Sequence, residues 1–338
     1  MTRLCDELPA GVPLAVVLSG SQAAGLGNVH SDLDVLVIAA EPVELPAWVA
    51  ESAELDVTSV PPARITQYAA ELAAAAADPT DRRALFADEP SRWKPLVQLV
   101  LGEPVRVTAR GRALLSSLDR KLLRRVLLAL FSVRAGNLTE DAVGALRSED
   151  LLTALCASEE AVRNAAEAAL VVLDDLYFAP KFLFRRLARQ PGLTWVLEHR
   201  EAFGLPAAGP AECRRIVRRR LWLAGHLNAR AVLNGADDVA TGLPPCVLHG
   251  AGPVRSPYFS LVRYRGGIGV TGPRSGYVLS EPAAALWAML DGRPAGEVLG
   301  ELDSLGHRTG SLAGEVERWL ELGVAVRRAD IRVGGENR

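Results

Sequence analysis

Three aspartates in the first sixty residues have the side chains that would hold a divalent metal ion. Asp32 and Asp34 open one apolar run, and Asp56 lies in another short run, Leu55–Val60, both of which are typical of strands. Side chains at positions i and i+2 of a strand point to the same face, so Asp32 and Asp34 face one way. Because Mg²⁺ prefers carboxylate oxygen, three such side chains beside a flexible turn are suited to hold it against a triphosphate.

The turn before these aspartates carries small residues at four positions: Gly20, Ser21, Gly25 and Ser31. Gly20 lets the backbone approach a phosphate closely, and Ser21 offers a hydroxyl and an amide donor. The alternative is a plain turn followed by an exposed strand start. Aspartate is disfavoured inside strands, so two of them opening a Val/Leu run favour a functional site.

This spacing resembles the signature of the nucleotidyltransferase superfamily, which includes polymerase β, tRNA nucleotidyltransferases and the small-molecule aminoglycoside nucleotidyltransferases. The matching residues are Gly20-Ser21, Gly25 and Ser31-Asp32-Leu33-Asp34. The resemblance covers about residues 10–105 and implies an α/β, polymerase β-like catalytic domain. It implies that three catalytic residues bind two Mg²⁺ ions: Asp32, Asp34 and Asp56. It also implies a set of nucleotide-binding residues: Gly20, Ser21, Gly25 and Ser31.

The elements expected around this site form a catalytic domain over residues 1–108. We expect three strands: Pro13–Ser19, Asp32–Ala39 and Leu55–Val60. Helices are predicted over Ile65–Ala77 and Trp93–Leu101, the latter ending at Gly102. Strands that alternate with helices in this way favour a small α/β fold.

Residues 109–236 show helical periodicity and no strand pattern, so we predict an all-α domain. We expect helices over Leu114–Val133, from Ser158 to about Phe178, and over Pro210–Asn234, with a break at Gly136–Asn137. A further predicted helix carries Lys181 and Arg185, which at i and i+4 share one face. A loose resemblance to small-molecule nucleotidyltransferases implies that this pair contacts the triphosphate. A solvated basic face explains the pair equally well.

A loop-rich linker, residues 237–254, precedes a small C-terminal domain over 255–328. We expect three short strands, Tyr258–Tyr264, Ile268–Thr271 and Tyr277–Leu279, followed by three helices. The segment from Leu279 to Gly292, with Trp287, resembles PqqD-like domains, the winged-helix modules called RiPP recognition elements. The resemblance implies that the leader of a precursor peptide adds as a strand to one sheet edge. A winged helix used for dimerisation or DNA binding is the alternative.

Composition limits the classes of partner. The 338 residues carry a net charge of −2, which argues against a long nucleic acid as the main partner. The four cysteines show no metal-binding spacing, and no signal segment or membrane-length apolar run is present, so we expect a cytoplasmic protein with no membrane partner. Lysine occurs only at positions 94, 121 and 181, which we interpret as a composition bias.

These observations favour one function over two alternatives. The main hypothesis is a nucleotidyltransferase that moves a nucleoside monophosphate from an NTP, with ATP favoured, to a precursor peptide held by the C-terminal domain. One alternative is a small-molecule nucleotidyltransferase of the antibiotic-modifying kind. The other is a non-catalytic antitoxin or scaffold that keeps the nucleotidyltransferase fold. The sequence leaves open the acceptor atom, the base of the nucleotide and the open edge of the C-terminal sheet.

Overall fold

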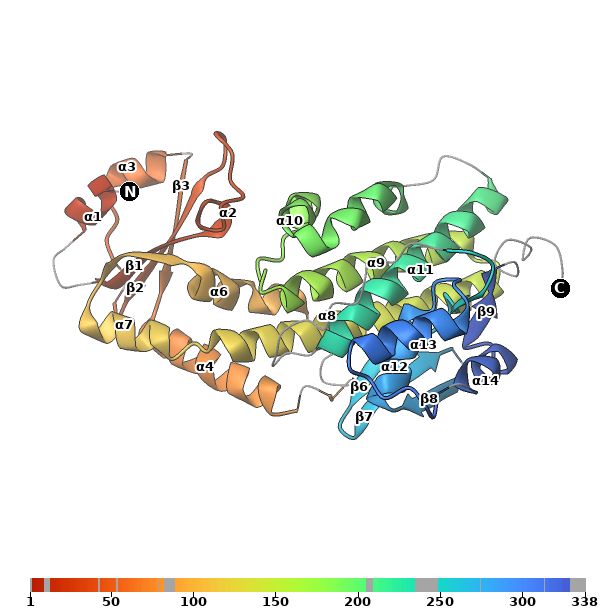
Figure 1. Ribbon diagram of the computed structural model, residues 1–338. Coiled ribbons are helices and arrows are strands. Elements are labelled where there is room, and N and C mark those ends of the chain that lie inside the picture. Colours follow the sequence, from red (N-terminus) through yellow and green to blue (C-terminus); the bar gives the residue numbers. More distant parts are fainter. Residues whose placement is uncertain are drawn as a thin grey trace. The chain divides into compact units, whose positions relative to one another are not determined.

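The strands that carry the predicted carboxylates form a four-stranded sheet in the computed structural model (Figure 1). The structure describes residues 2–8, 13–41, 43–52, 54–78, 80–81, 89–204, 209–234, 249–273, 275–312 and 314–328. The sheet order is β3-β2-β1-β4, from β1 (Pro13–Ser19), β2 (Leu33–Ala39), β3 (Leu55–Val60) and β4 (Glu103–Val107). β2 is antiparallel to β1 and parallel to β3, so β2 and β3 begin at the same edge of the sheet.

The chain divides into two units, each of which mixes helices with strands. The first comprises Met1–Pro79, Asp88–Leu127 and Asp175–Arg185, and the second comprises Thr80–Ala87, Leu128–Asp174 and Arg186–Arg338. The mixed α/β class agrees with the sequence. The finer division into domains ending at residues 108, 236 and 328 stays a prediction.

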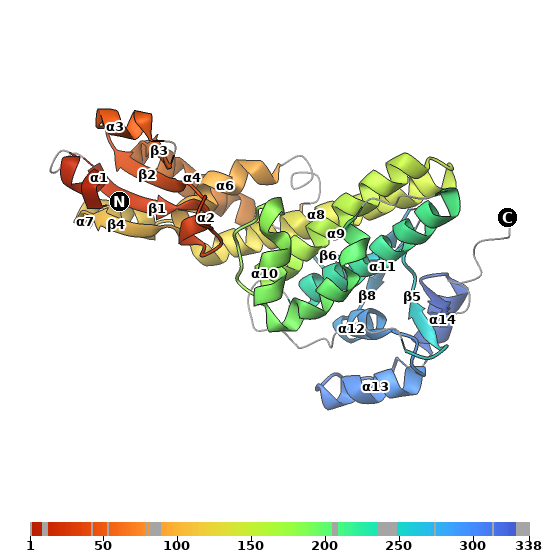
Figure 2. The same cartoon turned by 90° about the horizontal axis from the view of Figure 1, so that it is seen from above.

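Helices cover both faces of the sheet in the first unit (Figures 1 and 2). α1 (Thr2–Glu7) and α3 (Ala47–Glu51) lie on one face, where they share a buried cluster of Leu4, Leu8, Val16, Val35, Val37 and Val49. On the other face α6 (Pro90–Leu101) and α7 (Ala109–Ser116) pack on β1, and α4 (Pro62–Ala77) packs on α7. Alternate residues of β2 serve the two faces, as the two-residue period of a strand requires.

Three of the sequence predictions hold closely in this unit. β1 and β3 have the predicted bounds, and β2 begins one residue later than predicted, at Leu33, so Asp32 precedes the strand. The sequence did not predict β4. This edge strand has an exposed and intermediate burial pattern, so the apolar alternation that indicates a strand is weak there.

The second unit has long helices that pack side by side. α8 (Arg120–Arg147) enters it at Leu128 and is followed by α9 (Leu151–Val172), α10 (Leu183–Arg189), the 3-10 helix η2 (Pro191–Phe203) and α11 (Pro210–Asn234). α9 and α11 lie along each other through fully buried small and aliphatic residues. None of the described helices has the length and apolar character that a membrane crossing requires.

Several predicted helix boundaries are wrong. The predicted helix from Leu114 is divided between α7 and α8, and α9 ends at Val172 rather than near Phe178. α8 runs through Gly136–Asn137 without a break, because Gly136 lies against β6, with Val262 Cγ1 at 3.7 Å from where its Cβ would be. Tertiary packing overrides the low helix propensity of glycine there. α9 begins at Leu151 rather than at Ser158, and its N-cap is Asp150, whose side chain accepts the Thr153 N–H. Ser158 is buried inside the helix and donates to the Leu155 carbonyl at 3.0 Å.

The C-terminal part of the second unit contains two small sheets. β6 (Ser260–Tyr264), β7 (Gly267–Gly272) and β8 (Ser275–Leu279) form an antiparallel sheet in that order, and β5 (Pro253–Arg255) pairs with β9 (Ala325–Arg327). α12 (Glu281–Met289), α13 (Ala295–Ser304) and α14 (Glu315–Glu321) complete it. β5 includes Pro253 and Val254, which the sequence assigned to the linker; residues 237–248 of that segment lie outside the described residues.

Candidate functional site

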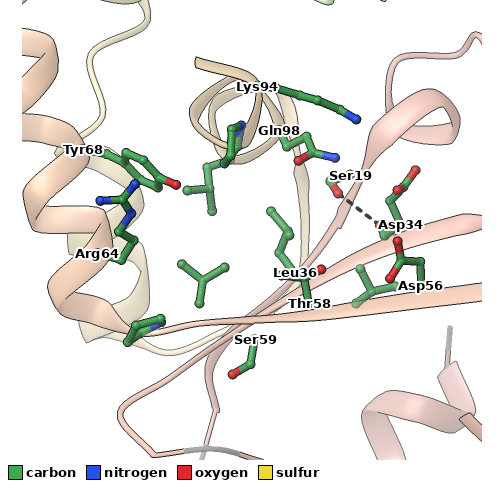
Figure 3. A pocket seen from close by; sticks show the side chains of 15 residues that line it. Ser19, Asp34, Leu36, Asp56, Thr58, Ser59, Arg64, Tyr68, Lys94 and Gln98 are labelled. Carbon is green, nitrogen blue, oxygen red and sulfur yellow. Dashed lines mark hydrogen bonds between the residues drawn. The ribbon is translucent and has the colours of Figure 1, made fainter. Parts of the chain in front are cut away.

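Asp34 and Asp56 lie side by side because their strands are paired in register. Asp34 pairs with Ser19 of β1 on one side and with Asp56 of β3 on the other. The Ser19 hydroxyl donates to the Asp34 carbonyl at 3.2 Å. Both carboxylates line the same pocket, so they project from the same face of the sheet (Figure 3).

The glycine turn is fitted to the Asp34 carboxylate. Gly20 has a φ of +68°, and a Cβ at this position would overlap Asp34 Oδ2. The backbone N–H of Ser21 donates to the same carboxylate, and the Ser21 carbonyl accepts from the N–H groups of Leu26 and Gly27 at 2.7 and 2.9 Å. Glycine is therefore required at position 20 both by its backbone conformation and by the position of Asp34.

Two other residues of the predicted set support the turn. Gly25 has a φ of +63°, which favours glycine. The Ser31 hydroxyl accepts the Asn28 N–H at 2.9 Å, and the Gln22 side chain donates to the carbonyls of Asn28 and Ser31. The pocket that Asp34 and Asp56 line includes none of the four predicted turn residues, Gly20, Ser21, Gly25 and Ser31. The turn therefore faces a different side of Asp34.

The acidic residues influence one another electrostatically. Burial raises the pKa of the Asp34 carboxyl above its ordinary value, and the charges of Asp32 and Asp56 raise it further. The Lys94 ammonium and the Ser21 N–H oppose this rise in the pKa of Asp34. Asp32 and Asp56 are exposed, and Asp34 is half-buried between them. A cation placed among these oxygens would relieve the repulsion that raises the pKa.

The carboxylates of Asp32, Asp34 and Asp56 suit Mg²⁺, although their oxygens are not already arranged around one ion position. Within the described ranges, no three Asp, Glu, His or Cys side chains form a group that could hold a metal ion as they stand. Mg²⁺ at phosphate-transfer sites is usually bound through one or two carboxylates plus substrate phosphates. Adjacent carboxylates of Asp34 and Asp56, with the charge of Asp32 nearby, fit that mode of binding.

A pocket of about 450 Å³ extends from these carboxylates between β3, α4 and α6. Figure 3 shows Lys94 and Gln98 reaching from α6 toward Ser19 and Asp34, and Arg64 and Tyr68 standing together on α4 at the other end. The sequence did not predict these four residues. Lysine is rare in this chain, and this rarity is a signal that could have indicated Lys94.

Lys181 and Arg185 lie apart from the pocket. Both cations flank the ring of Phe182, with Lys181 Nζ at 5.0 Å and Arg185 Cζ at 5.8 Å from its centroid. Lys181 belongs to the 3-10 helix η1 (Pro180–Phe182), and Arg185 belongs to α10. Arg185 Nη1 donates to the Leu26 carbonyl at 2.5 Å, so it holds the loop that follows the glycine turn.

The C-terminal sheet offers a second candidate surface in the second unit. α11 covers the β6 side, where Asn228 Nδ2 donates to the Leu261 carbonyl and the Ser260 hydroxyl at 2.9 Å. β8 is the opposite edge strand, no described strand pairs with its outer side, and Val278 is 80% exposed. Trp287 is fully buried, and its indole N–H donates to the Val324 carbonyl.

A pocket of about 330 Å³ lies near the first residue of β8. Its lining includes Arg147, Tyr258, Phe259, Ser275 and Leu322. The Arg147 guanidinium makes no hydrogen bond or ion pair with any residue that the structure describes. The pocket therefore combines aromatic walls with an available cation.

Comparisons with known proteins add no information about this site. No family model matches the chain, and no curated protein matches its sequence.

Proposed function

We propose that the chain is a Mg²⁺-dependent nucleotidyltransferase with a polymerase β-like catalytic unit. It transfers a nucleoside monophosphate from an NTP, with ATP as the expected donor, to an acceptor and releases pyrophosphate. One observation carries the proposal: Asp34 and Asp56 stand in register on neighbouring strands, beside a glycine that has no room for a side chain. Structural carboxylates rarely need such an arrangement, since like charges directly opposite each other destabilise a sheet.

Each residue of the site has a task in this reaction. Asp32, Asp34 and Asp56 would hold Mg²⁺, which when bound neutralises the triphosphate and clamps the attacking and leaving oxygens. Gly20 leaves the space that the Asp34 carboxylate fills, and the Ser21 N–H donates to that carboxylate, so both residues would orient a metal ligand. Asp56 is exposed on the pocket side, so its carboxylate is available to accept the proton of the acceptor hydroxyl.

We further propose that the C-terminal domain is a PqqD-like recognition element for a precursor peptide. The support is the edge strand β8: among the described strands none pairs with its outer side, so an added strand can bind there. The pocket that contains Arg147 lies at the beginning of β8, where it would receive a side chain of the added peptide. A tethered peptide reaches a high effective concentration at the catalytic site without a tight pocket for its acceptor residue.

The catalytic proposal is tested by nucleotide transfer in the full chain. The protein is incubated with Mg²⁺, each of the four common NTPs, and either candidate precursor peptides or an aminoglycoside panel. Pyrophosphate release and the mass of the acceptor are measured. Asp34→Asn should abolish transfer, whereas Asp6→Asn, a matched change on the exposed side of α1, should leave it intact. Transfer that survives in Asp34→Asn would contradict the metal site.

The peptide proposal is tested by binding. Val278→Asp and Arg147→Glu should each weaken binding of a precursor peptide about tenfold, because a buried contact or a charged hydrogen bond is worth about 1.5–3 kcal/mol. Leu305→Asp is the matched control, since Leu305 is another exposed apolar residue of the same unit. Labelling of a small hydroxyl acceptor with no peptide binding would favour the antibiotic-modifying alternative. Peptide binding without transfer to any acceptor would favour the scaffold alternative.

A further inference from the structure

The pocket between β3, α4 and α6 has charged groups of both signs. Asp34 and Asp56 stand at one end, where Lys94 reaches from α6 and its positive charge acts on Asp34 (Figure 3). Arg64 stands at the other end, and its guanidinium approaches the Glu71 carboxylate at 3.8 Å. A cationic ligand that extends along the pocket would meet Arg64, and an anionic one would meet the two aspartates. A single charge on the ligand is therefore repelled at one of the two ends.

The pocket wall also carries three uncharged polar groups, which are the hydroxyls of Thr58 and Tyr68 and the amide of Gln98. None of these three side chains makes a hydrogen bond to another residue in the described part of the chain. Tyr68 is only 7% exposed, yet its hydroxyl points into the pocket (Figure 3). Hydroxyl and amide groups both donate and accept, so the hydroxyl and amide groups of a ligand satisfy them without any charge.

Much of the remaining lining is apolar. It includes the side chains of Leu36, Val60, Pro95 and Leu99. The volume of about 450 Å³ falls within the range of small-molecule sites, which typically combine apolar walls with a few polar groups that fix the orientation of the ligand. The pocket thus suits a compact ligand that is recognised by hydrogen bonds rather than by charge.

The pocket includes the carboxylate that takes the acceptor proton in the proposed reaction. Asp56 is exposed and lines the pocket, and it pairs with Asp34 on the neighbouring strand. The glycine turn, residues 20–25, contributes nothing to the lining. A hydroxyl group at this end would lie beside Asp56, while the body of the same molecule would extend toward Tyr68.

We infer that this pocket receives the acceptor and that the acceptor is uncharged there: a hydroxyl compound whose further hydroxyl or amide groups bond to Thr58, Gln98 and Tyr68. This inference rests on the proposed function, because the reacting hydroxyl is the one that reaches Asp56. The hydrogen bonds at the far end orient the acceptor, which brings its hydroxyl to the reacting phosphorus without a charged anchor.

The reaction in this pocket balances with an NTP as co-substrate. The acceptor oxygen forms a bond to the α-phosphorus as the bond from that phosphorus to the bridging oxygen breaks. The electron pair of the broken bond leaves with pyrophosphate, and the hydroxyl proton passes to the Asp56 carboxylate. The groups that bond to Tyr68, Thr58 and Gln98 take no part in the bond changes.

Four probes with the same hydroxyl and different charges test the inference. N-acetylserine N-methylamide is neutral, N-acetylserine is anionic, serine N-methylamide is cationic, and free serine carries both charges. Their binding to the full chain is measured by ligand-observed NMR in the presence of Mg²⁺ and without nucleotide. The neutral probe should bind at least fivefold more tightly than each of the others. Equal binding of the four, or tighter binding of any charged form, would overturn the inference.

Matched variants place the binding in the pocket. Tyr68→Phe and Thr58→Val each remove one hydroxyl and keep the shape of the side chain. Each should weaken binding of the neutral probe about fivefold, the effect of losing one neutral hydrogen bond. Tyr264→Phe and Thr66→Val are the controls, because both residues lie outside the pocket lining. Unchanged binding in both pocket variants would overturn the inference.

The source of the uncharged groups is decided by a second comparison. N-acetylserine N-methylamide and methyl β-glucoside are offered as acceptors in the transfer assay. Preference for the blocked serine assigns the groups to peptide amides, and preference for the glucoside assigns them to sugar hydroxyls. Transfer confined to the anionic, cationic or doubly charged form of serine would contradict the inference alone. Selective binding of the neutral probe with no transfer to any acceptor would contradict the proposed function alone.

Discussion

Replacing Gly20 by alanine should damage the site through two separate costs. The first is backbone strain, because Gly20 has a φ of +68° and a left-handed conformation costs a residue with a Cβ about 1–2 kcal/mol. The second is steric, because the new Cβ would overlap Asp34 Oδ2 and push that side chain from its place. An off-rotamer side chain costs about 0.5–1.5 kcal/mol, so the sum is about 1.5–3.5 kcal/mol.

A double-mutant cycle separates the two costs. Asp34→Gly removes all three atoms that the Cβ would meet, so in that background Gly20→Ala retains only the backbone strain. The two changes should therefore be less than additive by about 0.5–1.5 kcal/mol. Gly306→Ala calibrates the strain alone, because Gly306 has a φ of +88° and nothing within 4 Å of the added Cβ.

Hydrogen exchange of the β1 and β2 amides, followed in urea, measures the stability of the first unit. Mg²⁺-dependent binding of an NTP is measured on the same variants and should be lost in Gly20→Ala, because Asp34 is displaced. Additivity within about 0.5 kcal/mol would refute the overlap as the cause. Unchanged NTP binding in Gly20→Ala would refute the assignment of this turn to the nucleotide.

Three further outcomes follow from other contacts. Burial and the charges of Asp32 and Asp56 raise the pKa of Asp34, so the folded protein loses stability as pH rises through that raised pKa and the carboxyl ionises. Without metal, Asp34→Asn should therefore melt at a higher temperature than the wild type at pH 7. Mg²⁺ should stabilise only the wild type. Arg185→Met should speed hydrogen exchange of the amides at residues 25–28, since Arg185 holds the Leu26 carbonyl, whereas Lys181→Met should not; equal exchange in the two variants would contradict this role. Burial and the neighbouring Arg255 charge lower the pKa of His226 well below 6.5, so the fold holds this histidine neutral and loses about 1.4 kcal/mol per pH unit as pH falls below 6.5. His226→Gln should flatten that dependence and His30→Gln should not, as measured by urea denaturation between pH 4 and 8.

Much of the local structure follows from the sequence alone. The bounds of β1, β3 and α11 agree with the predictions, because strand alternation and helix ends depend on residues close in the chain. The Gly-Ser turn followed by Asp32 and Asp34 is also a local pattern. The nucleotidyl transfer and peptide binding inferred from such patterns stay predictions that the experiments above test.

Other features depend on contacts between distant parts of the chain. Gly136 stays helical because it packs on β6, and Ser158 lies inside α9, where its hydroxyl bonds back to the Leu155 carbonyl. Neither outcome is visible in a window of neighbouring residues, because the free energy that decides them comes from tertiary packing.

The difference between what the sequence predicts and what the tertiary structure decides is clearest at the pocket. The sequence by itself predicted Asp32, Asp34 and Asp56 as metal ligands, because aspartates beside a glycine turn suit Mg²⁺, although Asp32 precedes β2 and is not placed by the strand period. Only the tertiary structure decided that Asp56 stands opposite Asp34 and that Lys94, Arg64 and Tyr68 line the hollow beside them. Strand register and helix packing bring these groups together from three parts of the chain, and both are set by the burial of the sheet faces rather than by any local pattern.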